Sequence, residues 1–120
     1  MATILGLRTV IYKVEDLEKA KEWYSKAFDT QPYFDEPYYI GYNIGGYELG
    51  LQTDENVKGT NVATFWGVED INKAYEHFIS LGATTDEAPM NVGGELMVAT
   101  VKDPWGNLVG LIYNPEFRLP

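Results

Sequence analysis

Hydrophobic and polar residues alternate along two short stretches of the chain, RTVIYKV at residues 8–14 and VATFWGV at residues 62–68. Alternation with a period of two is typical of a β-strand that buries one of its faces. An aspartate follows each stretch, Asp16 in the first and Asp70 in the second. Aspartate favours the capping position before a helix because its carboxylate accepts hydrogen bonds from free backbone amides. Each stretch is therefore predicted to be a strand that leads into a helix.

After each aspartate, apolar residues recur every three or four positions, as they do on one face of an α-helix. Further apolar runs then follow, interrupted by Gly-Gly, Asp-Pro and Gly-Asn turn signals. Each helix is thus predicted to precede about three more strands. The apolar helix positions are Leu17, Ala20, Tyr24, Ala27 and Phe28 in the first helix, and Ile71, Ala74, Tyr75, Phe78 and Leu81 in the second, with Gly82 as the expected stop.

The chain contains an internal repeat. Residues 9–30 align with residues 63–84 without a gap, and seven of the 22 positions are identical, including the capping aspartates. The last strands also correspond, since GYELGLQT from Gly46 and GNLVGLIY from Gly106 share the pattern Gly-x-x-x-Gly-Leu. The polar stretch Thr53–Thr60 is the expected connection between the two copies. Strand, helix and about three strands, twice over, is the predicted order of elements.

The patterns V-x-D-L-x-K-A-x-x-W-Y and D-P-x-G-N-x-x-x-L resemble those of the vicinal oxygen chelate superfamily, which includes glyoxalase I, bleomycin-resistance proteins and extradiol dioxygenases. The resemblance covers nearly the whole chain. It implies an α+β fold in which two βαβββ modules form a curled mixed sheet, shaped as a cup. We expect one domain over residues 1–120, made of two repeats at about 5–53 and 60–117. The scaffold hosts several chemistries, so it does not choose a function.

The resemblance also implies where a metal would be held, because catalytic members use His, Gln or Glu from the first and last strand of each module. In this sequence those positions are Thr9, Gly50, Ala63 and Gly110. Divalent metals need several anionic or imidazole ligands, and these four residues provide a single neutral hydroxyl. We therefore expect no metal and no other cofactor. An enzyme would need displaced ligands, for which Glu48, Gln52 and Glu95 are the candidates.

Glycine inside a strand often marks a place where another group approaches the backbone closely, and Gly50 and Gly110 occupy such positions. They either leave volume for a ligand in the cup or bend the sheet. Strand alternation places a largely apolar set of side chains on the same face, with Glu48 as a carboxylate that is a ligand contact, a catalytic base or a solvated rim residue. The expected ligand-binding residues are Thr9, Ile11, Glu48, Gly50, Ala63, Phe65, Trp105, Leu108 and Gly110.

Other aromatic residues and the single histidine are secondary candidates. One or two of the aromatic residues between positions 33 and 42 are expected to touch a ligand beside Trp105, and the others to lie in the core or an interface. His77 falls on the second predicted helix, behind the sheet, so we expect it to lie away from the cup. The aromatic set is Tyr33, Phe34, Tyr38, Tyr39 and Tyr42.

The amino-acid composition and net charge limit the kinds of binding partner that the chain is expected to have. The 120 residues include 9 basic and 18 acidic side chains, a net charge of −9, which repels nucleic acid and anionic membrane surfaces. There is no cysteine, so disulfides and thiolate chemistry are excluded. No apolar run approaches the roughly 18 residues of a membrane span, and the first residues lack a secretion signal. We expect a soluble, cytoplasmic protein.

Three functions are compatible with this sequence. The leading hypothesis is a metal-independent binding protein, resembling the bleomycin-resistance branch, that sequesters an aromatic or cationic small molecule in an apolar cup. The alternative is a metal-dependent lyase or dioxygenase of the glyoxalase type with displaced ligands. The third is an interaction module without a small ligand. Family members of this length generally pair, and an exposed sheet rich in tyrosine would leave an apolar patch in water, so a homodimer is expected.

Overall fold

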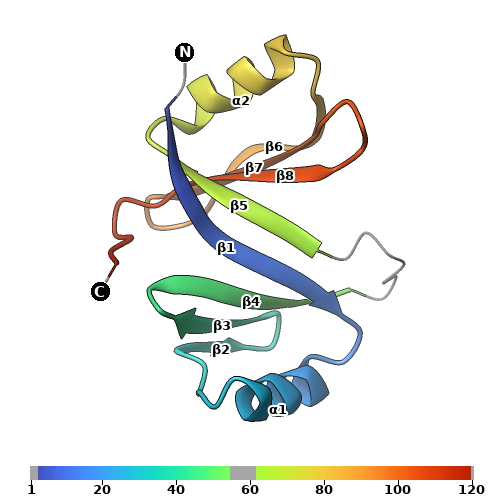
Figure 1. Cartoon of the computed structure of the whole chain (residues 1–120), viewed down its shortest axis with the longest axis vertical. Helices are drawn as coiled ribbons and strands as arrows, with labels where there is room; N and C mark the ends of the chain where they lie inside the picture. Colours follow the sequence, from blue (N-terminus) through green and yellow to red (C-terminus); the bar gives the residue numbers. More distant parts are fainter. Residues whose placement is uncertain (1–2, 55–61, 120) are drawn as a thin grey trace. The chain divides into compact units, whose positions relative to one another are not determined.

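The computed structural model describes residues 3–54 and 62–119, and residues 55–61, most of the expected connection between the copies, lie outside this description. The chain forms two βαβββ modules, as the sequence predicts (Figure 1). Module one consists of β1 (Ile4–Val14), α1 (Leu17–Ala27), β2 (Phe34–Glu36), β3 (Tyr39–Ile44) and β4 (Tyr47–Thr53). Module two consists of β5 (Val62–Val68), α2 (Ile71–Ser80), β6 (Thr84–Gly93), β7 (Leu96–Lys102) and β8 (Leu108–Tyr113).

Module one has a mixed sheet in the order β2-β3-β4-β1. The first strand β1 runs parallel to β4, with Thr9 opposite Glu48, and the other neighbours are antiparallel. One face of this sheet packs on α1. The core on that side contains Leu17, Ile40, Tyr42, Leu49 and Leu51, against which Tyr12 and Val14 pack.

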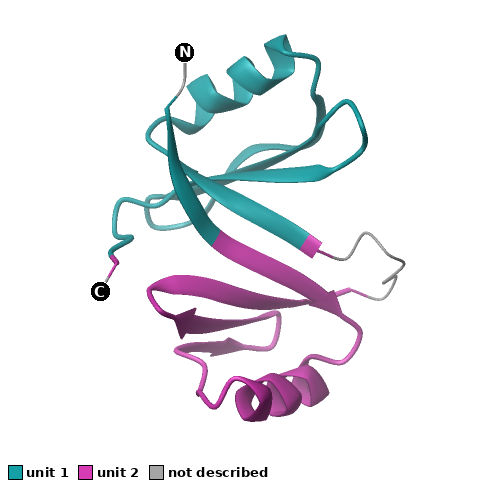
Figure 2. Cartoon of the chain, viewed as in Figure 1, with its two compact units in different colours: residues 1–8, 63–118 teal, residues 9–62, 119–120 magenta. Residues whose placement is uncertain are grey.

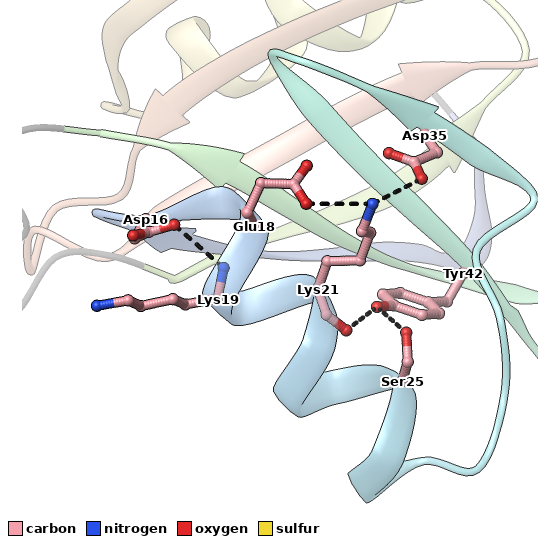
Figure 3. Close-up of polar contacts among 7 residues, drawn as sticks. All are labelled: Asp16, Glu18, Lys19, Lys21, Ser25, Asp35 and Tyr42. Carbon is pink, nitrogen blue, oxygen red and sulfur yellow. Dashed lines mark hydrogen bonds and ion pairs between the residues drawn. The ribbon is translucent and has the colours of Figure 1, made fainter.

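A polar network joins α1 to this sheet (Figure 3). The Tyr42 hydroxyl lies 2.9 Å from the Ser25 hydroxyl and donates to the Lys21 carbonyl at 3.0 Å. The Lys21 ammonium in turn bridges Glu18, at 3.4 Å, and Asp35, at 3.0 Å. Hydrogen bonding to Asp35 is the main cause of a raised Lys21 pKa. Tyr42 is therefore a core residue whose polar end is satisfied by the helix.

Module two repeats the arrangement in the order β5-β8-β7-β6, with β5 parallel to β8. Its core contains Val68, Ile71, Ala74, Ala99 and Leu111, again on the helix side of the sheet. The sixth strand starts at Thr84, directly after the helix and its Gly82 stop, and before any apolar run. Residues 84–88 are exposed and mostly polar, so they carry no hydrophobic alternation.

Both helices begin as predicted. Asp16 accepts a hydrogen bond from the Lys19 amide at 3.1 Å, and Asp70 from the Lys73 amide at 3.0 Å. The helices end one residue before the last apolar position that the pattern includes, because Phe28 and Leu81 are C-caps. No helix in residues 3–54 or 62–119 is long and apolar enough to cross a membrane.

The chain divides into two compact units whose boundaries differ from those of the modules (Figure 2). One unit contains residues 9–62 and 119–120, and the other contains residues 1–8 and 63–118. The first part of β1 thus belongs to the unit that holds module two.

Candidate functional site: the helix-free faces of the two sheets

In module one, four of the expected ligand-binding residues share the sheet face opposite α1, which we call the helix-free face. Leu49 and Leu51 pack on the helix side, so Glu48 and Gly50 point the other way. The register places Thr9 beside Glu48 and Ile11 beside Gly50. The structure thus places these four residues on one sheet face, and their contact with a ligand stays a prediction.

Two tyrosines cover the Glu48 carboxylate. The Tyr33 hydroxyl donates to Oε1 and the Tyr39 hydroxyl donates to Oε2. Tyr39 lies on β3, whereas Tyr33 precedes β2 and is fixed by a hydrogen bond of 3.0 Å from its amide to the Gly41 carbonyl. The sequence placed both tyrosines in an aromatic segment, but it gave no sign that they converge on Glu48.

Both phenols are held in the protonated form. Partial desolvation of its hydroxyl, followed by the hydrogen bond to and the charge of Glu48, raises the pKa of Tyr33 well above its usual 10.0. Burial, followed by the same carboxylate, raises the pKa of Tyr39 further. A phenolate beside a carboxylate would place two like charges together, so the hydroxyls remain donors at neutral pH. The cluster carries one negative charge flanked by two aromatic rings.

The glycine in the last strand of each module provides room for an aromatic ring. A Cβ atom on Gly50 would lie 2.0 Å from the Tyr39 hydroxyl oxygen, and one on Gly110 would lie 2.6 Å from the Phe65 ring. Neither glycine has a positive φ. The space that each glycine leaves is therefore occupied by a ring from its own module, and a ligand on these faces would meet Tyr39 or Phe65.

In module two, the helix-free face is apolar. Phe65 lies opposite Gly110 in the register, and Leu111 packs on the helix side, so Gly110 and Leu108 share the face with Phe65 and Ala63. Thr100 on β7 also contributes, and its hydroxyl donates to Asp86 at 2.7 Å. No carboxylate comparable to Glu48 stands at the matching position, which is Leu108.

Trp105 belongs to the turn between β7 and β8 and is 83% exposed. The Asp103 carboxylate holds this turn by accepting hydrogen bonds from the Asn107 side chain and from the Trp105 and Asn107 amides. These bonds, chiefly those from Asn107, lower the Asp103 pKa. The indole is thus presented to solvent on a well-formed turn.

The remaining candidates separate into helix-side and exposed residues. His77 lies in the last turn of α2, which packs on the helix side of module two, away from Gly110. Tyr38 is exposed and contacts Phe34 edge-on, with ring centroids 6.3 Å apart. Of the aromatic segment, Tyr33 and Tyr39 alone reach the Glu48 carboxylate.

The residues present do not fit a divalent metal. Both Glu48 oxygens already accept phenol hydrogens, and rings occupy the positions that side chains at Gly50 and Gly110 would need. Within residues 3–54 and 62–119, no group of three or more His, Cys, Asp or Glu side chains is placed to bind a metal. Gln52 lies on β4 beyond Gly50, and Glu95 lies in the turn between β6 and β7.

Solved structures share this fold at low identity. A variant of Streptomyces coelicolor methylmalonyl-CoA epimerase in complex with 2-nitronate-propionyl-CoA matches with a TM-score of 0.75 and 13% identity, over 98% of this chain and 100% of that chain. The Mn(II)-bound glyoxalase from Novosphingobium aromaticivorans matches with a TM-score of 0.72 and 13% identity, over 94% and 40%. A glyoxalase/bleomycin resistance protein/dioxygenase superfamily member from Vibrio splendidus 12B01 matches with a TM-score of 0.69 and 13% identity, over 95% and 100%.

These structural matches support the fold alone, because their identities are low. No curated protein matches the sequence closely enough to count as a relative. The family sequence model of the Glyoxalase/Bleomycin resistance protein/Dioxygenase superfamily matches residues 6–111, which include strands of both modules and both helices. The chain therefore belongs to the Glyoxalase/Bleomycin resistance protein/Dioxygenase superfamily.

Proposed function

We propose that this chain is a small-molecule-binding protein that holds an aromatic cation on the helix-free face of module one, without a metal or other cofactor. The superfamily includes binding proteins of the bleomycin-resistance type, which the sequence resembles. In this proposal Glu48 supplies the charge, and Thr9, Ile11 and Gly50 lie beside it. Module two, taken by itself, offers a second candidate surface for a flat ligand, made of Ala63, Phe65, Leu108, Gly110 and the exposed Trp105.

The placement of Glu48 between two phenols carries the proposal. A cation is attracted both by a carboxylate and by the faces of aromatic rings, and the two effects add when water is partly excluded. The net charge of −9 raises the local concentration of cations over the whole surface. Because both phenols stay protonated at neutral pH, they act as hydrogen-bond donors to Glu48 and add no charge of their own.

The mismatch with a metal favours binding over metal-assisted catalysis. The epimerase and the Mn(II)-bound glyoxalase share the scaffold, yet they show only that it accommodates several chemistries. In this chain the four ligand positions offer one hydroxyl, from Thr9. An enzyme of the glyoxalase type with displaced ligands at Glu48, Gln52 and Glu95 is the competing proposal, and a metal assay distinguishes the two.

Isothermal titration with N-methylquinolinium and with neutral quinoline tests the proposal. We expect the wild-type chain to bind the cation, and Glu48→Gln to weaken it by about 1–3 kcal/mol. Glu69→Gln is the matched control, because it removes the same charge from an exposed position in module two. Equal affinity of the cation for both variants and the wild type would contradict a role for Glu48.

Elemental analysis after dialysis tests the competing proposal. We expect no stoichiometric zinc, manganese, nickel or iron. About one metal ion per chain, lost in Glu48→Gln but retained in Glu69→Gln, would favour the enzyme and overturn the binding protein.

We also propose a homodimer. Tyr33 and Tyr38 are each more than 60% exposed, and Phe34 beside them is 39% exposed, so a continuous aromatic surface faces solvent in a single chain. Burial of such a patch in a symmetric interface would remove it from water. Sedimentation at micromolar concentration is expected to give twice the mass of one chain, and a persistent monomer would contradict the proposal.

A further inference from the structure

The guanidinium group of Arg8 packs closely against Gly67 and Phe117 in the compact unit that contains module two. A Cβ atom on Gly67 would lie 2.6 Å from its Nε, 2.7 Å from Cζ and 2.9 Å from one terminal nitrogen. Cζ also lies over the Phe117 ring, 3.9 Å from its centroid. The guanidinium thus contacts both the backbone of Gly67 and an aromatic ring.

A second glycine leaves room at the edge of the same group. A Cβ atom on Gly6 would lie 3.4 Å from Nη1 of Arg8, and Gly6 has a φ of +131°, which other residues adopt only with strain. Two glycines and one aromatic ring therefore shape the surroundings of a single side chain. Arg8 itself is partly exposed.

The positive charge of Arg8 has no acidic partner in the described part of the chain. None of the ion pairs among residues 3–54 and 62–119 involves it, although the sequence has twice as many acidic as basic residues. Its one hydrogen bond there runs from Nη1 to the Leu7 carbonyl at 3.3 Å. Most of the five N–H donors of the guanidinium are therefore available to an external acceptor.

We propose that Arg8 is the centre of an anion-binding site that takes a carboxylate or phosphate group. The planar guanidinium donates two parallel hydrogen bonds to two oxygens of such a group, and it is weakly hydrated, so stacking against Phe117 does not prevent binding. The overall charge of −9 repels anions from the surface in general, so binding depends on this local geometry. This proposal does not rest on the proposed cation site at Glu48.

Arginine side-chain NMR tests this site with an internal control. The sequence contains two arginines, Arg8 and Arg118, so two Nε–H signals are expected. Arg118 is exposed and donates to the carbonyls of Pro115 and Phe117. Benzoate and inorganic phosphate are titrated separately, with sodium chloride at equal ionic strength as the reference, and Arg118→Lys assigns the signals.

We expect the Arg8 signal to shift to saturation with at least one anion, while Arg118 follows the chloride reference. Saturation by benzoate alone identifies a carboxylate site, and saturation by phosphate alone identifies a phosphate site. A shift no larger than that with chloride, or equal shifts of both arginines, would overturn the proposal, because the response would then be general screening.

Variants separate binding from a purely structural role in holding the C-terminal segment. Arg8→Lys keeps the charge but loses the planar pair of donors, and we expect it to weaken the anion at least about tenfold. Gly67→Ala is expected to do the same by displacing the guanidinium, with the amide spectrum confirming the fold. The matched change Arg118→Lys should leave the affinity unchanged. Wild-type affinity in Arg8→Lys would contradict the proposal even if Gly67→Ala failed to fold.

Discussion

The two modules place a glycine at the same point of their last strand but surround it with different chemistry. Over Gly50 lies the phenol of Tyr39, from the antiparallel neighbour β3, and its hydroxyl reaches Glu48. Over Gly110 lies the ring of Phe65, from the parallel neighbour β5, and the position that matches Glu48 is Leu108. Both modules thus require a residue without a side chain at this position. The surroundings of that glycine are polar in module one and apolar in module two.

The largest effect is expected from adding a methyl group to each glycine. In Gly110→Ala the new Cβ overlaps three atoms of the Phe65 ring, so the whole side chain must move in a buried strand, and we expect a loss of about 1–3 kcal/mol in unfolding free energy. In Gly50→Ala the overlap involves the far end of Tyr39, which can swing outward, so a smaller loss is expected. Urea unfolding of both variants measures the difference.

An equal loss in both variants would remove the contrast between the modules. A larger loss in Gly50→Ala would show that the bond between Tyr39 and Glu48 stabilises the sheet more than the packing of Phe65 does. Gly45→Ala is not a suitable control because Gly45 has a positive φ.

Replacing Glu48 by leucine, the residue at the matching position of module two, tests the difference between the two modules further. Glu48→Leu leaves the half-buried Tyr39 hydroxyl without its acceptor, and we expect a loss of about 1–3 kcal/mol. The double variant Glu48→Leu with Tyr39→Phe removes both partners and should recover part of that loss. No recovery in thermal unfolding would mean that the hydroxyl finds another partner.

The tyrosine cluster also predicts a dependence on alkaline pH. The pKa values of Tyr33 and Tyr39 are raised above 10.0 in the folded chain, so the stability they contribute is present below pH 10 and is lost as the pH rises through the folded values. Unfolded tyrosine ionises first, which favours the unfolded state. The difference in unfolding free energy between wild type and Tyr39→Phe should therefore diminish above pH 10, and a constant difference would contradict the assignment.

The smallest effect is expected at the turns that precede the two last strands. Asp103 holds the turn of module two, whereas Asn43 at the matching position accepts from the Gly46 amide at 2.9 Å. The Asp103 pKa is lowered in the folded chain, so its contribution is present above the usual 3.8 and is lost as the pH falls through the folded value. The unfolding free energy of Asp103→Asn should thus be slightly lower than that of wild type near neutral pH. The two values should converge in acid, as acid-unfolding curves would show.

Local sequence rules were sufficient for the order of the elements and for the face to which the residues of β4 belong. The alternation around Leu49 and Leu51 assigns Glu48 and Gly50 to the helix-free face, and the capping aspartates give the helix starts. The family sequence model and the structure confirm the α+β fold of two βαβββ modules. By contrast, the start of β6 carries no apolar alternation, so the pattern could not reveal it.

The other features of the candidate sites depend on contacts between residues that are far apart in the sequence. That Tyr33 and Tyr39 meet at Glu48 follows from the register of β3 with β4 and from the bond between Tyr33 and Gly41, neither of which a single sequence specifies. The same holds for Arg8, whose neighbours Gly67 and Phe117 lie far along the chain. The expected ligand contacts remain a prediction for the titrations described above.

The division of β1 between the two compact units has a consequence for dissecting the molecule into fragments. The sequence repeat suggests a cut in the connection after residue 54, but such a cut separates Gly6 and Arg8 from Gly67 and Phe117. A fragment that begins at residue 62 would therefore lack residues 1–8, which belong to the same compact unit as residues 63–118. Circular permutation, with new ends in residues 55–61 and the old ends joined, keeps the N-terminal segment covalently attached to that unit, and it is the better way to open the chain.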